Sequence, residues 1–145
     1  MNDFDITTIG PDSASATNFW AICVNFTLNG ARGCHIPVKQ GDDVLWAYAN
    51  KATTKFYLNL TGPTTATLGI RTPFHVTDGL TKLPVQGARV YIDGASPSAP
   101  SDSGGNVDII FNKLGSQGLK AEKPDDSIRS NKWPVNVRPK GAAKL

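Results

Sequence analysis

Hydrophobic and polar residues alternate along most of this chain, which is the pattern of half-buried β-strands. Residues 74–94 show the pattern most clearly: a first run ends at Asp78-Gly79, and a second run over residues 85–92 ends at Asp93-Gly94. Asp-Gly pairs favour tight turns between strands. The chain therefore predicts a mainly-β protein whose antiparallel strands each bury one face, as in a small β-sandwich.

The predicted strands fall into two units separated by a break in composition at residues 61–65, Thr-Gly-Pro-Thr-Thr. Residues 1–17 lack periodicity and predict a flexible N-terminal segment, and residues 140–145 form a tail. The first unit, 18–68, is expected to hold strands at residues 19–28, 34–39, 44–48 and 55–60. The second unit, 69–139, is expected to hold strands at residues 73–78, 84–92, 106–111, 117–123 and 133–138.

Composition agrees with this architecture. With 145 residues and 39% hydrophobic content, the chain can bury one moderate core or two small ones. Fourteen glycines and ten prolines favour strands and turns over helices. No apolar stretch approaches the roughly 18–20 residues that a membrane-spanning helix needs, so no membrane span is expected.

The net charge of +3 is concentrated at the C-terminal end. Residues 1–112 hold seven Lys and Arg against nine Asp and Glu, whereas residues 113–145 hold eight against three. These cations are scattered and not interleaved with aromatic residues, which favours a solvated strand face. We therefore expect no nucleic-acid partner.

The two cysteines, Cys23 and Cys34, predict one disulfide across a hairpin. Residues 19–28 read as one strand, and Asn29-Gly30 is a strong signal for the turn that follows it. A loop centred slightly before this pair would place the cysteines directly opposite each other. The alternative is two buried free thiols.

Two glycosylation sequons begin at Asn25 and Asn59. In the predicted strands both asparagines alternate with apolar neighbours, so both are expected on the solvent side, where a glycan must lie. Together with the predicted disulfide, they indicate a secreted or cell-surface protein. The N-terminal residues are polar and lack the apolar stretch of a signal peptide, so we interpret the chain as a mature fragment with an added start methionine.

The first unit resembles the β-grasp module of transcobalamin-type proteins and of many secreted surface proteins. The resemblance rests on Phe19-Trp20-Ala21-Ile22-Cys23-Val24-Asn25, then Gly33-Cys34, and then the stretch from Val38 to Tyr48 with its Gly-Asp-Asp-Val-Leu-Trp core. It implies a small β-grasp-like N-terminal module. Cobalamin binding in that family relies on a helical partner domain that this chain lacks, so no cofactor is expected.

The second unit is similar to the immunoglobulin-like or prealbumin-like repeats of secreted bacterial or fungal adhesins. The matching residues are Val76-Thr77-Asp78-Gly79, the stretch from Leu83 to Val90, and Leu119-Lys120-Ala121-Glu122-Lys123. The resemblance implies an immunoglobulin-like antiparallel β-sandwich. The chain departs from the repeat at Lys82, where a glycine is usual, and at residues 93–105, which replace a short turn.

Residues that carry chemistry are sparse. Asp102-Ser103-Gly104-Gly105 resembles the nucleophile loop of trypsin-like proteases, but neither His35 nor His75 sits in a recognisable histidine motif. Aspartate, cysteine and histidine spacings match no calcium or zinc motif, although a calcium site built from separate loops stays open. We predict no catalytic residue and no metal ligand.

The aromatic residues fall into two groups, according to which face of the alternating strand each one is expected to occupy. Trp20, Trp46 and Trp133 alternate in step with apolar neighbours and are expected in the core. Tyr57 and Tyr91 fall on the outward phase and are candidate ligand-binding residues. Ser101 and Asp102 are further candidates, because they lie in the long Ser/Pro/Gly loop at residues 93–105 and loops of this length are often functional.

The sequence therefore favours a non-enzymatic binding or adhesion protein that presents rigid β faces and a long loop to a protein or glycan partner. A carbohydrate-binding module or lectin with exposed aromatic residues is the alternative. A hydrolase whose site cannot be assembled from the sequence is a third hypothesis.

Overall fold

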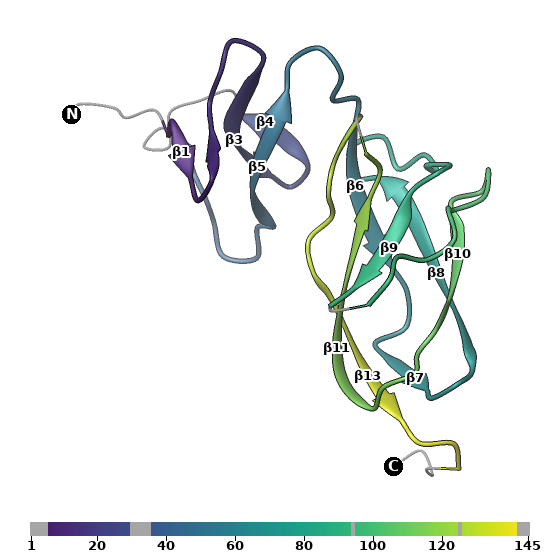
Figure 1. Cartoon of the computed structure of the whole chain (residues 1–145). Coiled ribbons are helices and arrows are strands. Elements are labelled where there is room, and N and C mark those ends of the chain that lie inside the picture. The colour runs from purple at the N-terminus through teal and green to yellow at the C-terminus, as the bar shows by residue number, and fades with distance from the viewer. Residues whose placement is uncertain (1–5, 30–35, 94, 125, 142–145) are drawn as a thin grey trace.

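A computed structural model describes residues 6–29, 36–93, 95–124 and 126–141, and within these ranges the chain is all-β (Figure 1). The prediction of a mainly-β sandwich protein is confirmed. None of these residues forms a helix long and apolar enough to cross a membrane.

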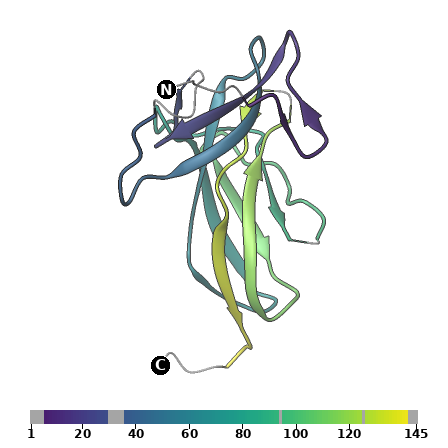
Figure 2. The same ribbon diagram turned by 90° about the vertical axis from the view of Figure 1, so that its left-hand side faces the viewer.

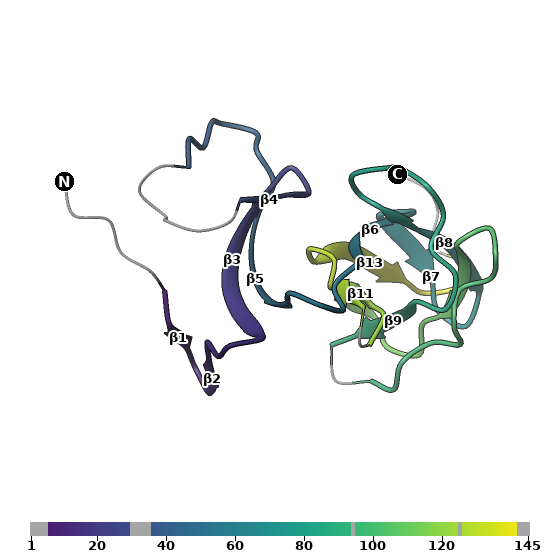
Figure 3. The ribbon, with the colours of Figure 1, turned by 90° about the horizontal axis from the view of Figure 1, so that it is seen from above.

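Eight strands form the sandwich. They are β6 (Phe56–Thr61), β7 (Thr65–Thr67), β8 (Arg71–Asp78), β9 (Arg89–Ile92), β10 (Asn106–Ile110), β11 (Gly115–Glu122), β12 (Ser127–Ile128) and β13 (Trp133–Arg138). One sheet has the order β10-β8-β6-β12 and the other the order β7-β13-β11-β9. The pairs β12–β6 and β13–β7 are parallel, and the others are antiparallel. The two sheets face each other around the core (Figure 3).

The core of the sandwich takes side chains from both sheets, as their alternation predicts. Alternation in the predicted strand at residues 106–111 predicts that Val107, Ile109 and Phe111 point inward, and their exposed fractions are 5%, 3% and 2%. Leu119 and Ala121 on the opposite sheet are fully buried. These inward positions are confirmed.

Five strands precede the sandwich: β1 (Thr8–Ile9), β2 (Asp12–Ser13), β3 (Asn18–Val24), β4 (Thr27–Asn29) and β5 (Val44–Asn50). The strands β1 and β2 form a small hairpin, and the other three form a sheet of order β4-β3-β5. This three-stranded sheet lies at one end of the sandwich, and the C-terminus lies at the other (Figures 1 and 2).

A small apolar cluster joins the N-terminal sheet to the sandwich. Cys23, Ala47 and Ala49 of the sheet pack with Ile128, and Tyr57 packs against the same cluster. Three of these five side chains are small, so the backbone of the sheet comes close to the sandwich. The contact fixes which face of β3 and β5 points inward.

The division between the sheets differs from the predicted boundary near residue 68. Strand β6 pairs with β8 and β12, and β7 pairs with β13, so residues 56–67 are part of the sandwich. The chain leaves the N-terminal sheet at Asn50, the end of β5, and enters the sandwich at Phe56, the start of β6. The break at residues 61–65 is the connection that carries the chain from one sandwich sheet to the other.

The first predicted hairpin turn is also displaced. Residues 19–28 do not form one strand, because Asn25 and Phe26 adopt φ values of 49° and 65° and reverse the chain between β3 and β4. Two successive positive φ angles define the type I′ turn that suits a two-residue hairpin. Gly30, the second residue of the predicted turn, lies outside the described residues, as do residues 34 and 35 of the predicted strand 34–39. Residues 36–39 form no strand.

Lys82, which stands where the resembling repeat usually has glycine, adopts a φ of 64°. The backbone therefore keeps a left-handed conformation that glycine adopts without steric cost. The Lys82 ammonium lies 4.8 Å from the centre of the Phe26 ring. This cation–π contact links the turn of the N-terminal hairpin to the sandwich.

Candidate functional site

The outer face of the N-terminal sheet carries three large aromatic rings. Cross-strand pairing sets Trp20 opposite Tyr48 and Ile22 opposite Trp46, so these side chains share one face. The exposed fraction is 40% for Trp46 and 36% for Tyr48. The Trp20 and Tyr48 rings lie 5.2 Å apart between centres and are tilted by 43°.

The β1–β2 hairpin holds two of these rings in place. The Trp20 indole N–H donates to the Asp12 carbonyl oxygen at 3.0 Å, and the Tyr48 hydroxyl donates to the Ser13 carbonyl oxygen at 2.6 Å. Both polar groups are therefore satisfied within the chain. The faces of the rings, and not their polar atoms, are left for a ligand.

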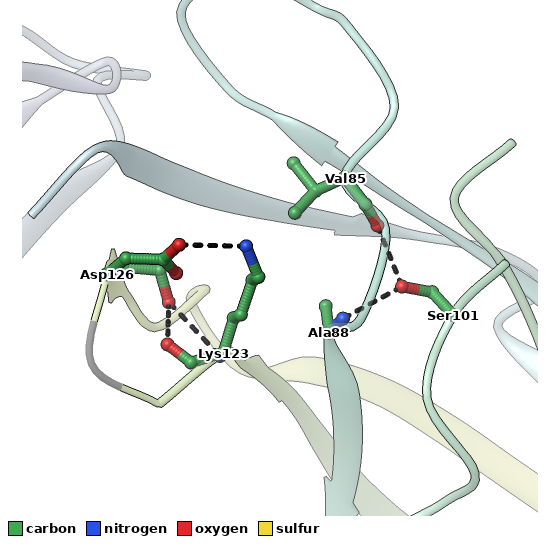
Figure 4. Close-up of polar contacts among 6 residues, drawn as sticks. Val85, Ala88, Ser101, Lys123 and Asp126 are labelled. Carbon is green, nitrogen blue, oxygen red and sulfur yellow. Dashed lines mark hydrogen bonds and ion pairs between the residues drawn. The ribbon is translucent and has the colours of Figure 1, made fainter. Parts of the chain in front are cut away.

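A groove of about 320 Å³ runs beside these rings. One wall consists of Trp20 and residues 45–48, the other of residues 122–124 and 127–129. Asp12, Glu122 and Arg129 add charge to the rim, whereas Lys123 is paired with Asp126 at 2.8 Å (Figure 4). The groove thus combines aromatic surface with charged and polar groups.

The predicted core placement is wrong for Trp46 and for Trp20, which is half-buried on the same outer face, and correct in part for Trp133. Trp133 is half-buried and packs against the sandwich core. Trp46 faces outward because Ala47 and Ala49 occupy the face of β5 that packs on Ile128. The signal in the sequence was the alternation of large and small residues at 46–49, where the smaller side chains mark the face of closest approach.

The two candidate tyrosines do not form a common platform. Tyr57 lies on β6, is half-buried and packs against the cluster around Cys23, and burial raises the pKa of its hydroxyl. Tyr91 lies on β9 in the other sandwich sheet, half-buried and opposite Lys120. The structure brings neither ring next to the groove.

Ser101 is a structural residue in this fold. Its side chain is buried, with 3% of the residue exposed. Its hydroxyl accepts a hydrogen bond from the Ala88 amide at 2.9 Å and donates one to the Val85 carbonyl oxygen at 2.7 Å (Figure 4). Both of its hydrogen-bonding roles are used inside the chain.

Asp102 organises its own loop. One carboxylate oxygen accepts hydrogen bonds from the amides of Gly104 and Asn106, at 2.9 and 2.8 Å. The bonds from Asn106 are the main reason why the pKa of Asp102 lies below its usual range. His75 lies beside the same loop, with Nε2 2.7 Å from the Gly104 carbonyl oxygen. Ser103 is exposed, and His35 lies outside the described residues.

Residues 95–101, which belong to the long loop, cover the free edge of β9. The Ser98 hydroxyl accepts a hydrogen bond from the Val90 amide, and the Ser98 amide donates one to the Val90 carbonyl oxygen. The Ser101 amide donates to the Ala88 carbonyl oxygen at 2.7 Å. These bonds satisfy the backbone of an edge strand. Presentation of the loop to a partner stays a prediction.

Cys23 is a free thiol in the structure, with 3% exposed. Burial raises its pKa to about 11. Cys34, the predicted partner, lies outside the described residues. The geometry of Cys23 therefore corresponds to the free-thiol alternative, and the face that holds it packs on the sandwich.

The two sequon asparagines differ in their surroundings. Asn25 is exposed, but its side-chain amide donates to Asp42 at 2.8 Å and its side-chain oxygen accepts from the Asp43 amide at 3.0 Å. Asn59 is half-buried between the buried residues Leu58 and Leu60 of β6. Asn25 is therefore the more accessible acceptor, but its side chain is already held by two hydrogen bonds.

Comparisons with known proteins assign the chain to no protein family. No protein-family model matches the chain, and a search of curated proteins found no similar sequence. Among the residues that the structure describes, no three His, Cys, Asp or Glu side chains gather where they could hold a metal ion.

Proposed function

We propose that this chain is a non-enzymatic binding protein that acts outside the cell or at its surface and holds a partner in the groove beside β5. The observation that carries the proposal is the position of Trp46, 40% exposed on a strand held by its pairing with β3. Large aromatic side chains on a rigid surface are enriched where proteins bind partners.

The exposure of Trp46 and Tyr48 is not needed for folding. The small inner face of the same strand provides the contact with the sandwich through Ala47 and Ala49. An indole ring in water gives up the free energy that burial would provide, which amounts to a few kcal/mol for a large aromatic side chain. A partner that covers the ring recovers part of it.

The charged rim supports a specific contact. Glu122 lies in β11 with an intermediate exposure, and Arg129 is exposed across the groove from Trp46. Charged side chains around an apolar centre set orientation and suppress wrong partners more than they add affinity. The proposed partner therefore meets an aromatic centre and a polar rim.

The decisive experiment compares Trp46→Ala with Ile110→Ala. Ile110 is 57% exposed on β10, so the control also removes an exposed hydrophobic side chain. Binding to arrayed extracellular proteins and glycans should fall by about 30-fold or more for Trp46→Ala, the effect of losing a hot-spot residue of about 2 kcal/mol. Ile110→Ala should bind as the parent does. Equal binding by all three proteins would reject the groove as the site.

The extracellular location is tested separately. Intact mass measured from a secreting host, with and without reductant, reports glycans on Asn25 and Asn59 and any bond between Cys23 and Cys34. Sugar on Asn59 with retention of the fold supports an extracellular protein. Absence of both modifications would remove the support that the sequence offers for this compartment.

A carbohydrate-binding module is the second candidate. It is favoured by the outward rings of Trp46 and Tyr48, because aromatic faces offer apolar surface and nearby Asp12, Glu122 and Arg129 can bond to hydroxyl groups. In this case glycans and not proteins should bind. Trp46→Ala and Tyr48→Ala should then abolish sugar binding, and Tyr91→Ala should leave it intact.

A further inference from the structure

The edge of β5 that points away from β3 has no strand partner in the described part of the chain. The sheet has the order β4-β3-β5, so β5 is an edge strand. At seven residues it is longer than β10, one of the edge strands of the sandwich, which has five. An unpaired strand edge presents a row of backbone donors and acceptors that can pair with another chain.

The direction of the backbone groups of β5 follows from two hydrogen bonds at its ends. The Asn25 amide donates to the Asp43 carbonyl oxygen at 2.8 Å, and the Lys51 amide donates to the Thr17 carbonyl oxygen at 2.9 Å. In an antiparallel ladder such bonds recur at every second residue. Residues 45, 47 and 49 therefore bond toward β3, and Val44, Trp46 and Tyr48 direct N–H and C=O to the free side. For Asn50, the same groups bond to Thr54.

The same chain covers a comparable edge elsewhere. Val90 and Ala88 on the outer side of the β9 edge bond to Ser98 and Ser101 of the loop that follows. No such bond to Val44, Trp46 or Tyr48 occurs among the described residues. Residues 98 and 101 thus satisfy the edge of β9, whereas no described residue bonds to the outer edge of β5 at these three positions.

β5 also lacks the features that keep an edge strand from pairing. Its sequence, Val-Leu-Trp-Ala-Tyr-Ala-Asn, contains no charged residue and no proline. Natural proteins protect exposed edges with charges, prolines, bulges or short strands. By contrast, β10 carries Asp108 at its centre, paired with Arg71 at 3.4 Å. The unprotected edge of β5 is therefore suited to forming a β-ladder.

The groove described above runs along this edge. Its β5 wall includes Leu45 and Ala47 from the inner face and Trp46 and Tyr48 from the outer face, so the groove follows the strand edge itself. Residues 122–124 and 127–129 form the opposite wall. A groove closed on its far side accepts a single added strand about 4.8 Å from β5. A second copy of the chain would bring its β3 along with its β5.

We propose that the groove binds an extended peptide segment of a partner protein, which adds to the sheet as a strand beside β5. The inference rests on the proposed function and specifies its ligand. Backbone groups of Val44, Trp46 and Tyr48, spaced about 7 Å apart, supply main-chain hydrogen bonds to the peptide. Apolar peptide side chains contact the Trp46 ring on one face and Pro124 and Ile128 on the other.

The test distinguishes the contribution of the Trp46 backbone N–H to peptide binding from that of the Trp46 ring. Trp46→Ala and Trp46→Pro both lack the ring, but the proline variant also lacks the outward N–H. Proline is tolerated where the N–H of an edge strand faces solvent, so both variants should fold. The probe is a displayed library of random heptapeptides, selected on the parent protein.

Selected peptides should bind Trp46→Ala with reduced affinity, and Trp46→Pro at least tenfold more weakly than Trp46→Ala. In ¹⁵N spectra of the parent, peptide addition should shift the amides of Val44, Trp46 and Tyr48. If Trp46→Pro does not fold, peptides N-methylated at alternate amides supply the same test: one of the two methylation phases should abolish binding, and the other should not.

Three results would overturn the inference. They are a selection that yields no binder, equal affinity of Trp46→Ala and Trp46→Pro, and equal tolerance of both methylation phases. Dimerisation of the parent that Trp46→Pro prevents would assign the edge to a second copy of the chain. Glycan binding that depends on the Trp46 ring, without peptide binding, would keep the site and reject the strand.

Discussion

Replacement of Ser101 by alanine tests whether this residue acts in the fold or at a ligand. The hydroxyl group joins the Ala88 amide to the Val85 carbonyl oxygen, at 2.9 and 2.7 Å. Ala88 and Val85 are 0% and 2% exposed, so water does not reach either residue readily. Ser101→Ala therefore leaves one donor and one acceptor in the sandwich without their partner.

The expected loss of stability follows from those two groups. A buried polar group left without a partner costs about 1–3 kcal/mol. Val85 O has a second lone pair and some room to relax, so we expect a total of about 2–4 kcal/mol for Ser101→Ala. In a chain of this size 1 kcal/mol lowers the melting temperature by about 2–4 °C, which gives a decrease of about 4–16 °C.

Unfolding in guanidinium, followed by tryptophan fluorescence, and a thermal scan measure this loss. Ser103→Ala is the matched control, because Ser103 lies in the same loop but is exposed. A substitution at such a position usually changes stability by less than about 0.5 kcal/mol. The midpoint should therefore move for Ser101→Ala and stay in place for Ser103→Ala.

Equal stability of the two variants would refute the structural role of the Ser101 hydroxyl. If Ser101→Ala also lost binding to a partner while it kept its melting temperature, Ser101 would be a ligand residue, as the loop composition predicted. A large loss of stability with unchanged binding at room temperature would support the role derived from the contacts.

Three further results are expected. Gly105→Ala should destabilise the fold by more than about 2 kcal/mol, because residue 105 has a φ of 77° and a Cβ there would lie 2.3 Å from the Val76 carbonyl oxygen; a melting temperature equal to the parent's would contradict this. Cys23, whose pKa burial raises to about 11, should react with iodoacetamide at pH 8 after unfolding but not before, and rapid labelling of the native protein would argue against its burial. Burial opposes ionisation of Asp78, but hydrogen bonds from Thr81 and the Tyr57 amide outweigh it and hold its pKa below the usual range. Its contribution to the unfolding free energy is therefore present above the usual aspartate pKa and lost as the pH falls below it, so Asp78→Asn should flatten the stability profile between pH 7 and 3; parallel profiles would contradict this.

Alternation was sufficient to predict the sandwich core. Val107 and Ile109 on one strand, and Leu119 and Ala121 on another, point inward as expected, because each strand of the sandwich has one large apolar face and one polar face. Pro134 has no N–H to donate to a ladder and is the second residue of β13. β7 pairs with β13 only from Asn136 onward, so the missing donor of Pro134 faces no strand.

Alternation was not sufficient for the N-terminal sheet, because both of its faces are hydrophobic. Trp20 and Trp46 share one face, and Ala21 and Ala47 share the other. Size favoured the tryptophan face as the core side, but the sandwich requires close approach and packs on the alanine face. Because the alanine face packs on the sandwich, the tryptophan face lies outside and borders the groove. The groove could not be predicted from the N-terminal sheet alone, because the sandwich forms its other wall.

The local sequence alone determined the longer strands of the sandwich and their inward residues, because these depend on a period of two. Tertiary structure decided which face of β5 is buried, that residues 95–101 cover the edge of β9, and that no strand of the described ranges pairs with the outer edge of β5. These outcomes depend on contacts between segments distant in the chain, and no local pattern records which backbone groups such contacts satisfy.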